Sequence, residues 1–147
     1  MSKRNLIVFV IALTFVGWLS FGSSSLLAQA IPSVTYDELI KNKDKYVGKT
    51  VRVKAIWTYG FEWTFLCDEQ CKNRDDKAWV DMADEDELCD GSKSKLKRMG
   101  DQFNNRADVT IIGTLTPAGT FGHMGQYRRA FRITCVERFK KLRTKQS

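Results

Sequence analysis

The sequence contains one histidine, His123, and has no Cys-x2-Cys pair, and no Gly-Lys-Ser/Thr motif follows the glycines near His123. Zinc sites in proteins usually combine closely spaced cysteine and histidine ligands. The four cysteines are instead separated by 4, 18 and 46 positions. Without the Gly-Lys-Ser/Thr signature, the glycines near His123 predict a turn rather than a phosphate cradle. We therefore expect no metal, no cofactor and no enzymatic activity, with a small enzyme that uses His123 as a distant alternative.

No apolar run is long enough to cross a bilayer, which takes about 20 residues. The longest, residues 6–19, follows Lys3 and Arg4 and leads to Ala-Gln-Ala at positions 28–30. A positive start, a short apolar run and an A-x-A site are typical of a secretory signal peptide. We expect residues 1–30 to be a signal peptide cleaved after Ala30, which makes the protein secreted or periplasmic. An uncleaved membrane anchor is the alternative.

All four cysteines, at positions 67, 71, 89 and 135, lie beyond this segment. An even number of cysteines in an exported chain predicts a disulfide framework. Two disulfides can be connected in three ways, and spacing alone leaves all three open.

Residues 31–139 alternate between patterns typical of strands and of short helices. Thr35 and Glu38 form a capping box, which predicts a helix start. Apolar side chains at every second position predict strands with one buried face. Five strands are expected, over residues 49–59, 61–67, 77–82, 108–116 and 127–139. In the first strand the inward side chains are Val51, Val53, Ala55, Trp57 and Tyr59. In the second they are Phe61, Trp63, Phe65 and Cys67. Leu96, Met99 and Phe103 have helical spacing, so a second helix is expected between the third and fourth strands.

Three strands, a helix and two strands are the element order of the OB-fold, a five-stranded Greek-key barrel. Residues 46–53 resemble the first strand of OB-fold domains of the nucleic-acid-binding or tRNA-anticodon-like type, and residues 108–115 resemble their fourth strand. Residues 122–128 are similar to small exported bacterial proteins of that type, whose function is uncharacterised. The predicted fold class is therefore all-β. The barrel topology that this resemblance implies favours two disulfides, Cys67–Cys71 and Cys89–Cys135.

OB barrels usually bind ligands on the face of strands 2 and 3, between the loops that join strands 1–2 and 4–5. The residues expected near that face are Tyr59, Trp79, His123, Tyr127, Arg128 and Arg132. A tryptophan beside arginines can stack on a base, a sugar or a peptide ring. The alternative is that Trp79 packs beneath the loop that holds Cys71 or beneath the helix. We expect a non-enzymatic module that binds an envelope or extracellular ligand or protein, with single-stranded nucleic acid as the alternative partner.

The formal charge of +7 is unevenly distributed. Residues 31–137 hold 17 Lys and Arg against 17 Asp and Glu, whereas the last ten residues hold five basic residues and no acid. We expect a barrel over residues 31–139 that is neutral through residue 137, and a basic tail over residues 140–147. Such a tail can contact anionic polymers or keep the chain soluble.

Overall fold

A computed structural model of the protein describes residues 30–73, 75–99 and 105–143. The predicted signal peptide therefore lies outside the described residues, apart from Ala30. The elements, in chain order, are β1 (Ser33–Thr35), α1 (Tyr36–Lys41), α2 (Lys43–Tyr46), β2 (Thr50–Tyr59), β3 (Thr64–Cys67), β4 (Ala78–Met82), α3 (Ser92–Leu96), β5 (Asn105–Leu115), the 3₁₀ turn η1 (His123–Gly125) and β6 (Ala130–Leu142). Among the described helices, none is long and apolar enough to span a membrane.

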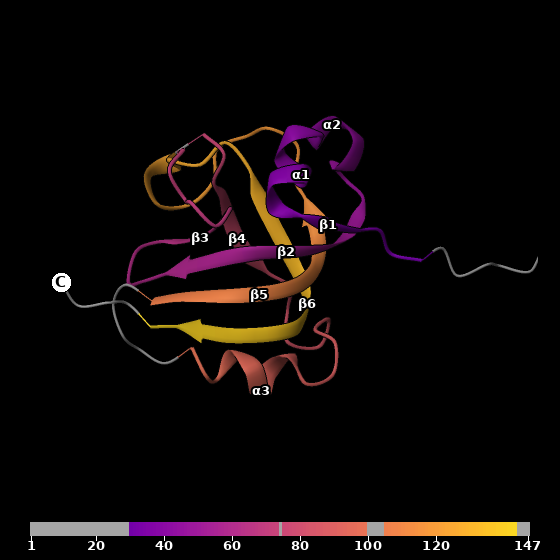
Figure 1. The fold of residues 1–147 in the computed structure, drawn as a ribbon, viewed down its shortest axis with the longest axis vertical. Coiled ribbons are helices and arrows are strands. Elements are labelled where there is room, and N and C mark those ends of the chain that lie inside the picture. Colours follow the sequence, from indigo (N-terminus) through magenta and orange to yellow (C-terminus); the bar gives the residue numbers. More distant parts are fainter. Residues whose placement is uncertain (1–29, 74, 100–104, 144–147) are drawn as a thin grey trace, which may run out of the picture.

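Strands β2 to β6 close into a barrel (Figure 1). Neighbouring strands follow the order β2-β3-β4-β6-β5, and an additional pairing between β2 and β5 completes the circle. The β4–β6 pair is parallel, and the other pairs within the barrel are antiparallel. The short β1 adds to β2 in parallel, outside the closed barrel. The predicted all-β, OB-fold-like barrel, with a helix between its third and fourth strands, is confirmed.

The barrel interior is filled by the inward faces of its long strands. Every second residue of β2, from Val51 to Tyr59, is buried, as the alternation predicted. The indole N–H of Trp57, deep in this face, donates a hydrogen bond to Thr64 Oγ1 over 2.8 Å. The corresponding buried residues of β5 and β6 are Ala107, Val109, Ile111, Leu115, Phe131, Ile133, Val136 and Phe139. Because one face of each strand is apolar, the strand registers that close this core are strongly favoured.

The predicted orientation of the second barrel strand is wrong. We expected residues 61–67 to form this strand with Phe65 inward, but β3 begins only at Thr64. A turn precedes it, in which the Gly60 amide donates to the Trp63 carbonyl. Pairing with β2 places Leu66 opposite Trp57, so Leu66 is fully buried and Phe65 faces outward. A shift of one residue in register moves every side chain of a strand to the other face.

The first helix begins where the capping box predicted. Thr35 is the N-cap of α1, and its hydroxyl accepts a hydrogen bond from the Glu38 amide over 3.2 Å. The Glu38 carboxylate accepts from the Tyr46 hydroxyl instead. Leu39 is buried, so α1 packs on the barrel through this side chain.

The structure pairs Cys67 with Cys71 and Cys89 with Cys135, with Cα atoms 5.2 and 5.0 Å apart. These are the pairs that the OB-fold resemblance implies. The first holds the loop after β3, and the second joins the segment before α3 to the middle of β6. Among the described residues there is no free cysteine.

The boundary between barrel and tail lies later than predicted. β6 continues through Lys140 and Lys141 to Leu142, and Lys140 pairs with Asp108 of β5. The first three residues of the predicted tail are therefore part of the barrel, because β5 extends far enough to pair with them. Residues 144–147 lie outside the described residues, as does Phe103 of the predicted second helix.

Gly113 of β5 lies where β6 approaches most closely. A Cβ atom at this position would collide with the carbonyl oxygen of Arg132 and the ring of Phe131. Gly113→Ala is therefore expected to lower the free energy of unfolding by about 2 kcal/mol through overpacking. Urea denaturation measures this loss.

Gly48→Ala is the matched control. Gly48 has φ +75° and no atom within 4 Å of an added Cβ, so only backbone strain of about 1 kcal/mol is expected there. Wild-type stability of Gly113→Ala would contradict the close approach of the two strands.

Candidate functional site

Three aromatic rings gather on the outer face of β3 and β4. Phe65 of β3 lies directly opposite Trp79 of β4, and opposite residues of paired strands project to the same face. Tyr127, from the loop before β6, contacts both of them. Its ring centroid lies 5.8 Å from that of Phe65 and 5.4 Å from that of Trp79. We call Phe65, Trp79 and Tyr127 the aromatic cluster.

The loop between β5 and β6 packs closely on the aromatic cluster. A Cβ atom at Gly122, which has φ +73°, would meet the rings of Trp79 and Tyr127 at 2.5 to 2.7 Å. Phe121 and Tyr127 form a backbone bridge that closes the loop. Trp79 therefore packs beneath the loop between β5 and β6 on one side, whereas the alternative prediction named the loop that holds Cys71, and it stays partly exposed.

A hollow of ≈ 470 Å³ adjoins the aromatic cluster. It is lined by Trp79 and His123 and by the segment that joins β2 to β3, namely Gly60, Phe61, Glu62, Trp63 and Thr64. Phe61 is 78% exposed and Met124 of η1 is 83% exposed. Both loops that flank this face therefore present a large apolar side chain to solvent. Glu62 and His123 add polar groups to the same region.

Of the predicted site residues, three lie in this region. Trp79 and Tyr127 belong to the aromatic cluster, and His123 lines the hollow. Arg128 is exposed on the adjacent loop, where its carbonyl accepts from the Gly119 amide. The remaining two, Tyr59 and Arg132, have other contacts.

Tyr59 lies in the core, which makes its placement among the ligand-binding residues wrong. Its ring packs against Trp57 at 6.0 Å, and its hydroxyl donates to the Met99 carbonyl. Burial raises the pKa of the hydroxyl. Tyr59 ends the inward face of β2, so the strand alternation decides its position.

Arg132 is held by two carboxylates. Its guanidinium donates to Glu87 Oε2 at 2.9 Å and to Asp81 Oδ2 at 3.2 Å. These hydrogen bonds, that with Glu87 first, raise the pKa of the guanidinium. Arg132 therefore ties the acidic segment after β4 to β6, and a ligand would have to compete with both carboxylates.

Phe65 and Trp63 are the residues of this region that the sequence analysis missed. Their alternation with polar neighbours resembles that of core residues. The contrary signal was Leu66, an aliphatic side chain on the face assigned to solvent. The Lys77 ammonium lies 4.7 Å from the centroid of the Phe65 ring, so a cation also reaches the aromatic cluster.

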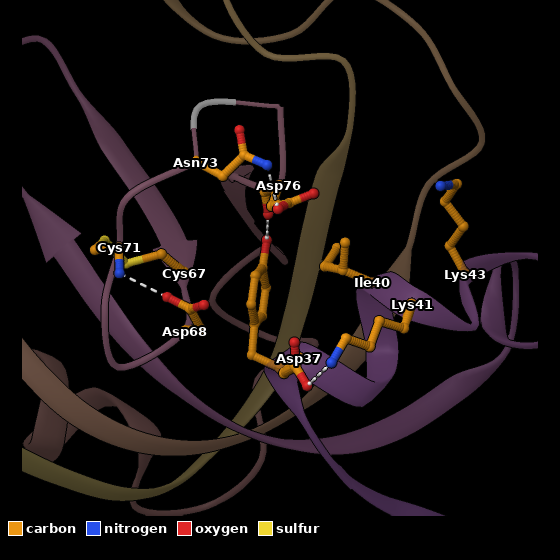
Figure 2. A pocket seen from close by; sticks show the side chains of 10 residues that line it. Asp37, Ile40, Lys41, Lys43, Cys67, Asp68, Cys71, Asn73 and Asp76 are labelled. Carbon is orange, nitrogen blue, oxygen red and sulfur yellow. Dashed lines mark hydrogen bonds and ion pairs between the residues drawn. A yellow bond between two sulfur atoms is a disulfide. The ribbon is translucent and has the colours of Figure 1, made fainter.

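A second hollow, of ≈ 210 Å³, lies between α1 and the Cys67–Cys71 loop (Figure 2). Most of its polar groups already have partners within the protein. The Tyr36 hydroxyl donates to the Asp76 carbonyl at 2.6 Å, and burial strongly raises its pKa. Asp68 accepts from the Cys71 amide, and Lys41 pairs with Asp37. This hollow is a polar contact region between α1 and the Cys67–Cys71 loop.

The described residues offer little for covalent or metal chemistry. The four cysteines are paired, so they provide no thiolate nucleophile. In residues 30–73, 75–99 and 105–143, no group of three His, Cys, Asp or Glu side chains is placed to hold a metal ion. The arrangement around the aromatic cluster favours stacking and apolar contact.

Comparison with protein-family models, curated proteins and solved structures found no match to this chain.

Proposed function

We propose that the protein is an exported, non-enzymatic binding module that holds its ligand on the aromatic cluster. The observation that carries this proposal is the contact of Phe65, Trp79 and Tyr127 on an outer face of the barrel, between two loops with exposed apolar tips. Export rests on the signal-like segment of residues 1–30 and is supported by two disulfides, which persist in oxidising compartments.

The chemistry of the aromatic cluster favours a ligand with a flat or ring-shaped face. Aromatic rings stack on sugars, bases and aromatic or proline side chains, and each stacked base contributes about 1–3 kcal/mol. Glu62 and His123 line the adjoining hollow and can orient polar groups of such a ligand. Pockets that combine an apolar surface with a few polar groups are typical of binding sites.

Tryptophan indole N–H signals in nuclear magnetic resonance spectra test this site directly. We expect a ring-bearing probe, either a chito-oligosaccharide or a tyrosine-containing peptide, to shift the signals of Trp79 and Trp63. The signal of Trp57 should stay in place, because its N–H is bonded to Thr64 inside the barrel. Phe65→Ala should weaken probe binding about tenfold through the loss of one stacked ring.

Ile40→Ala is a control variant, since Ile40 lines the other hollow. Unchanged affinity in Phe65→Ala, or the absence of any shift at Trp79 with both probes, would contradict the proposal. Oligothymidylate that binds the aromatic cluster with steep salt dependence would assign the site to single-stranded nucleic acid instead.

A further inference from the structure

Two groups of cations far apart in the sequence lie at one end of the barrel. Lys97 and Arg98 follow the last turn of α3, and Lys140, Lys141 and Arg143 lie at the end of β6. All five side chains are exposed. We call these five residues the basic surface.

Hydrogen bonds hold the segment that carries Lys97 and Arg98 against the barrel. At one end of the segment 92–99, Ser92 Oγ accepts from the Val136 amide at 2.9 Å. At its other end, the Met99 carbonyl accepts from the hydroxyl of Tyr59, whose ring packs on Phe139. The segment therefore runs beside β6 toward the end of that strand, as Figure 1 shows for α3. Lys97 and Arg98 consequently lie near the carboxyl end of β6.

The basic surface borders on Asp108, which lies opposite Lys140 and forms an ion pair with Arg138. In the described part of the chain, none of its five cations forms an ion pair. Nearby cations that do have partners are Lys93, with Glu85, and Arg138, with Asp108. Five unpaired cations in one area generate a local positive potential, although residues 31–137 are neutral in sum.

We propose that the basic surface docks on the headgroups of an anionic lipid bilayer. None of its cations lines the two hollows described above, and none lines a third hollow of ≈ 780 Å³ that Leu142 borders at the end of β6. Proteins that bind single-stranded nucleic acid combine a cationic groove with aromatic platforms. Here the aromatic cluster lies near the start of β6, where Trp79 pairs with Ala130, about ten residues away along the strand. A group of exposed lysines and arginines that lines none of these hollows suits a planar array of anionic headgroups.

This placement leaves the aromatic cluster accessible while the basic surface contacts lipid. The proposal does not depend on the ligand of the aromatic cluster. Phe65→Ala is expected to leave vesicle binding unchanged, so each proposal can fail without the other.

Vesicle sedimentation with the purified full chain tests the inference. The vesicles are phosphatidylcholine alone, or phosphatidylcholine with phosphatidylglycerol. We expect binding that requires phosphatidylglycerol and weakens as salt rises. An apolar N-terminal segment would bind both kinds of vesicle, so the difference between them isolates the electrostatic contribution. The test variant combines Lys97→Gln, Arg98→Gln and Lys140→Gln.

The control variant combines Lys45→Gln, Lys49→Gln and Lys72→Gln, three exposed cations outside the basic surface. Both variants lose three positive charges. Each cation near an anionic bilayer contributes about fivefold to partitioning, so the test variant should lose roughly two orders of magnitude and the control far less. Melting curves check that both variants stay folded.

Equal losses in the two variants would show that net charge alone drives association, and would overturn the proposal. So would the absence of a preference for phosphatidylglycerol. Salt-sensitive binding of oligothymidylate that is lost only in the test variant, without vesicle binding, would assign the basic surface to nucleic acid.

Discussion

Replacing Cys89 and Cys135 together by alanine is expected to lower the free energy of unfolding by about 4 kcal/mol. The bond spans 46 positions, and closing a loop of that length restricts the unfolded chain substantially. The folded state should keep its arrangement, because the Cys89 amide also donates to the Thr134 carbonyl and Ser92 Oγ accepts from Val136. Urea denaturation of the purified variant measures the loss.

Replacing Cys67 and Cys71 by alanine provides the matched comparison. This bond spans four positions, so the same reasoning predicts a loss of about 2 kcal/mol. A larger loss from the short loop than from the long one would contradict the assigned pairing. It would also contradict the assumption that the bonds act mainly on the unfolded state.

Leu66→Ala is expected to lower the free energy of unfolding by about 3 kcal/mol, the cost of a cavity in a packed core. Leu66 is fully buried inside the barrel, opposite Trp57 of β2. Its neighbour Phe65 lies on the outer face, where it contacts Tyr127. Phe65→Ala should therefore cost only about 1 kcal/mol, the value of a surface ring pair.

Chemical denaturation of the two variants decides the orientation of β3. The alternation of residues 61–67 by itself predicts the opposite order, with Phe65→Ala the more damaging change. If Phe65→Ala unfolded the protein more readily than Leu66→Ala, the aromatic cluster would be part of the core. The proposed binding face would then be lost with it.

The inward faces of the long strands were predictable because the alternation of apolar and polar residues within each strand shows which face is buried. Every second residue of β2 is apolar, and the same holds for most of β5, so one face of each strand must turn inward. The second barrel strand lacks this property. Phe65 and Leu66 are both apolar, so the pairing of β3 with β2, together with the turn at Gly60, decides which of them is buried.

The candidate site was only partly predictable for the same reason. Trp79 and Tyr127 were expected on the outer face, but their contact depends on how closely the loop holding Gly122 packs. Arg132 is outward-facing as expected, yet the carboxylates of Asp81 and Glu87 hold it. Long-range ion pairs of this kind leave no local pattern in the sequence.

Local patterns in the sequence determined the barrel class, the first helix and the inward faces of the long strands. They act over a few residues, through capping, alternation and turn formation. The tertiary structure alone decided the orientation of β3 and the joining of two groups of cations into the basic surface. The last of these depends on α3 lying beside β6, a contact between residues about 45 positions apart. The sequence placed the excess of positive charge in the last ten residues, and only the packing of the chain brought Lys97 and Arg98 to the same end of the barrel.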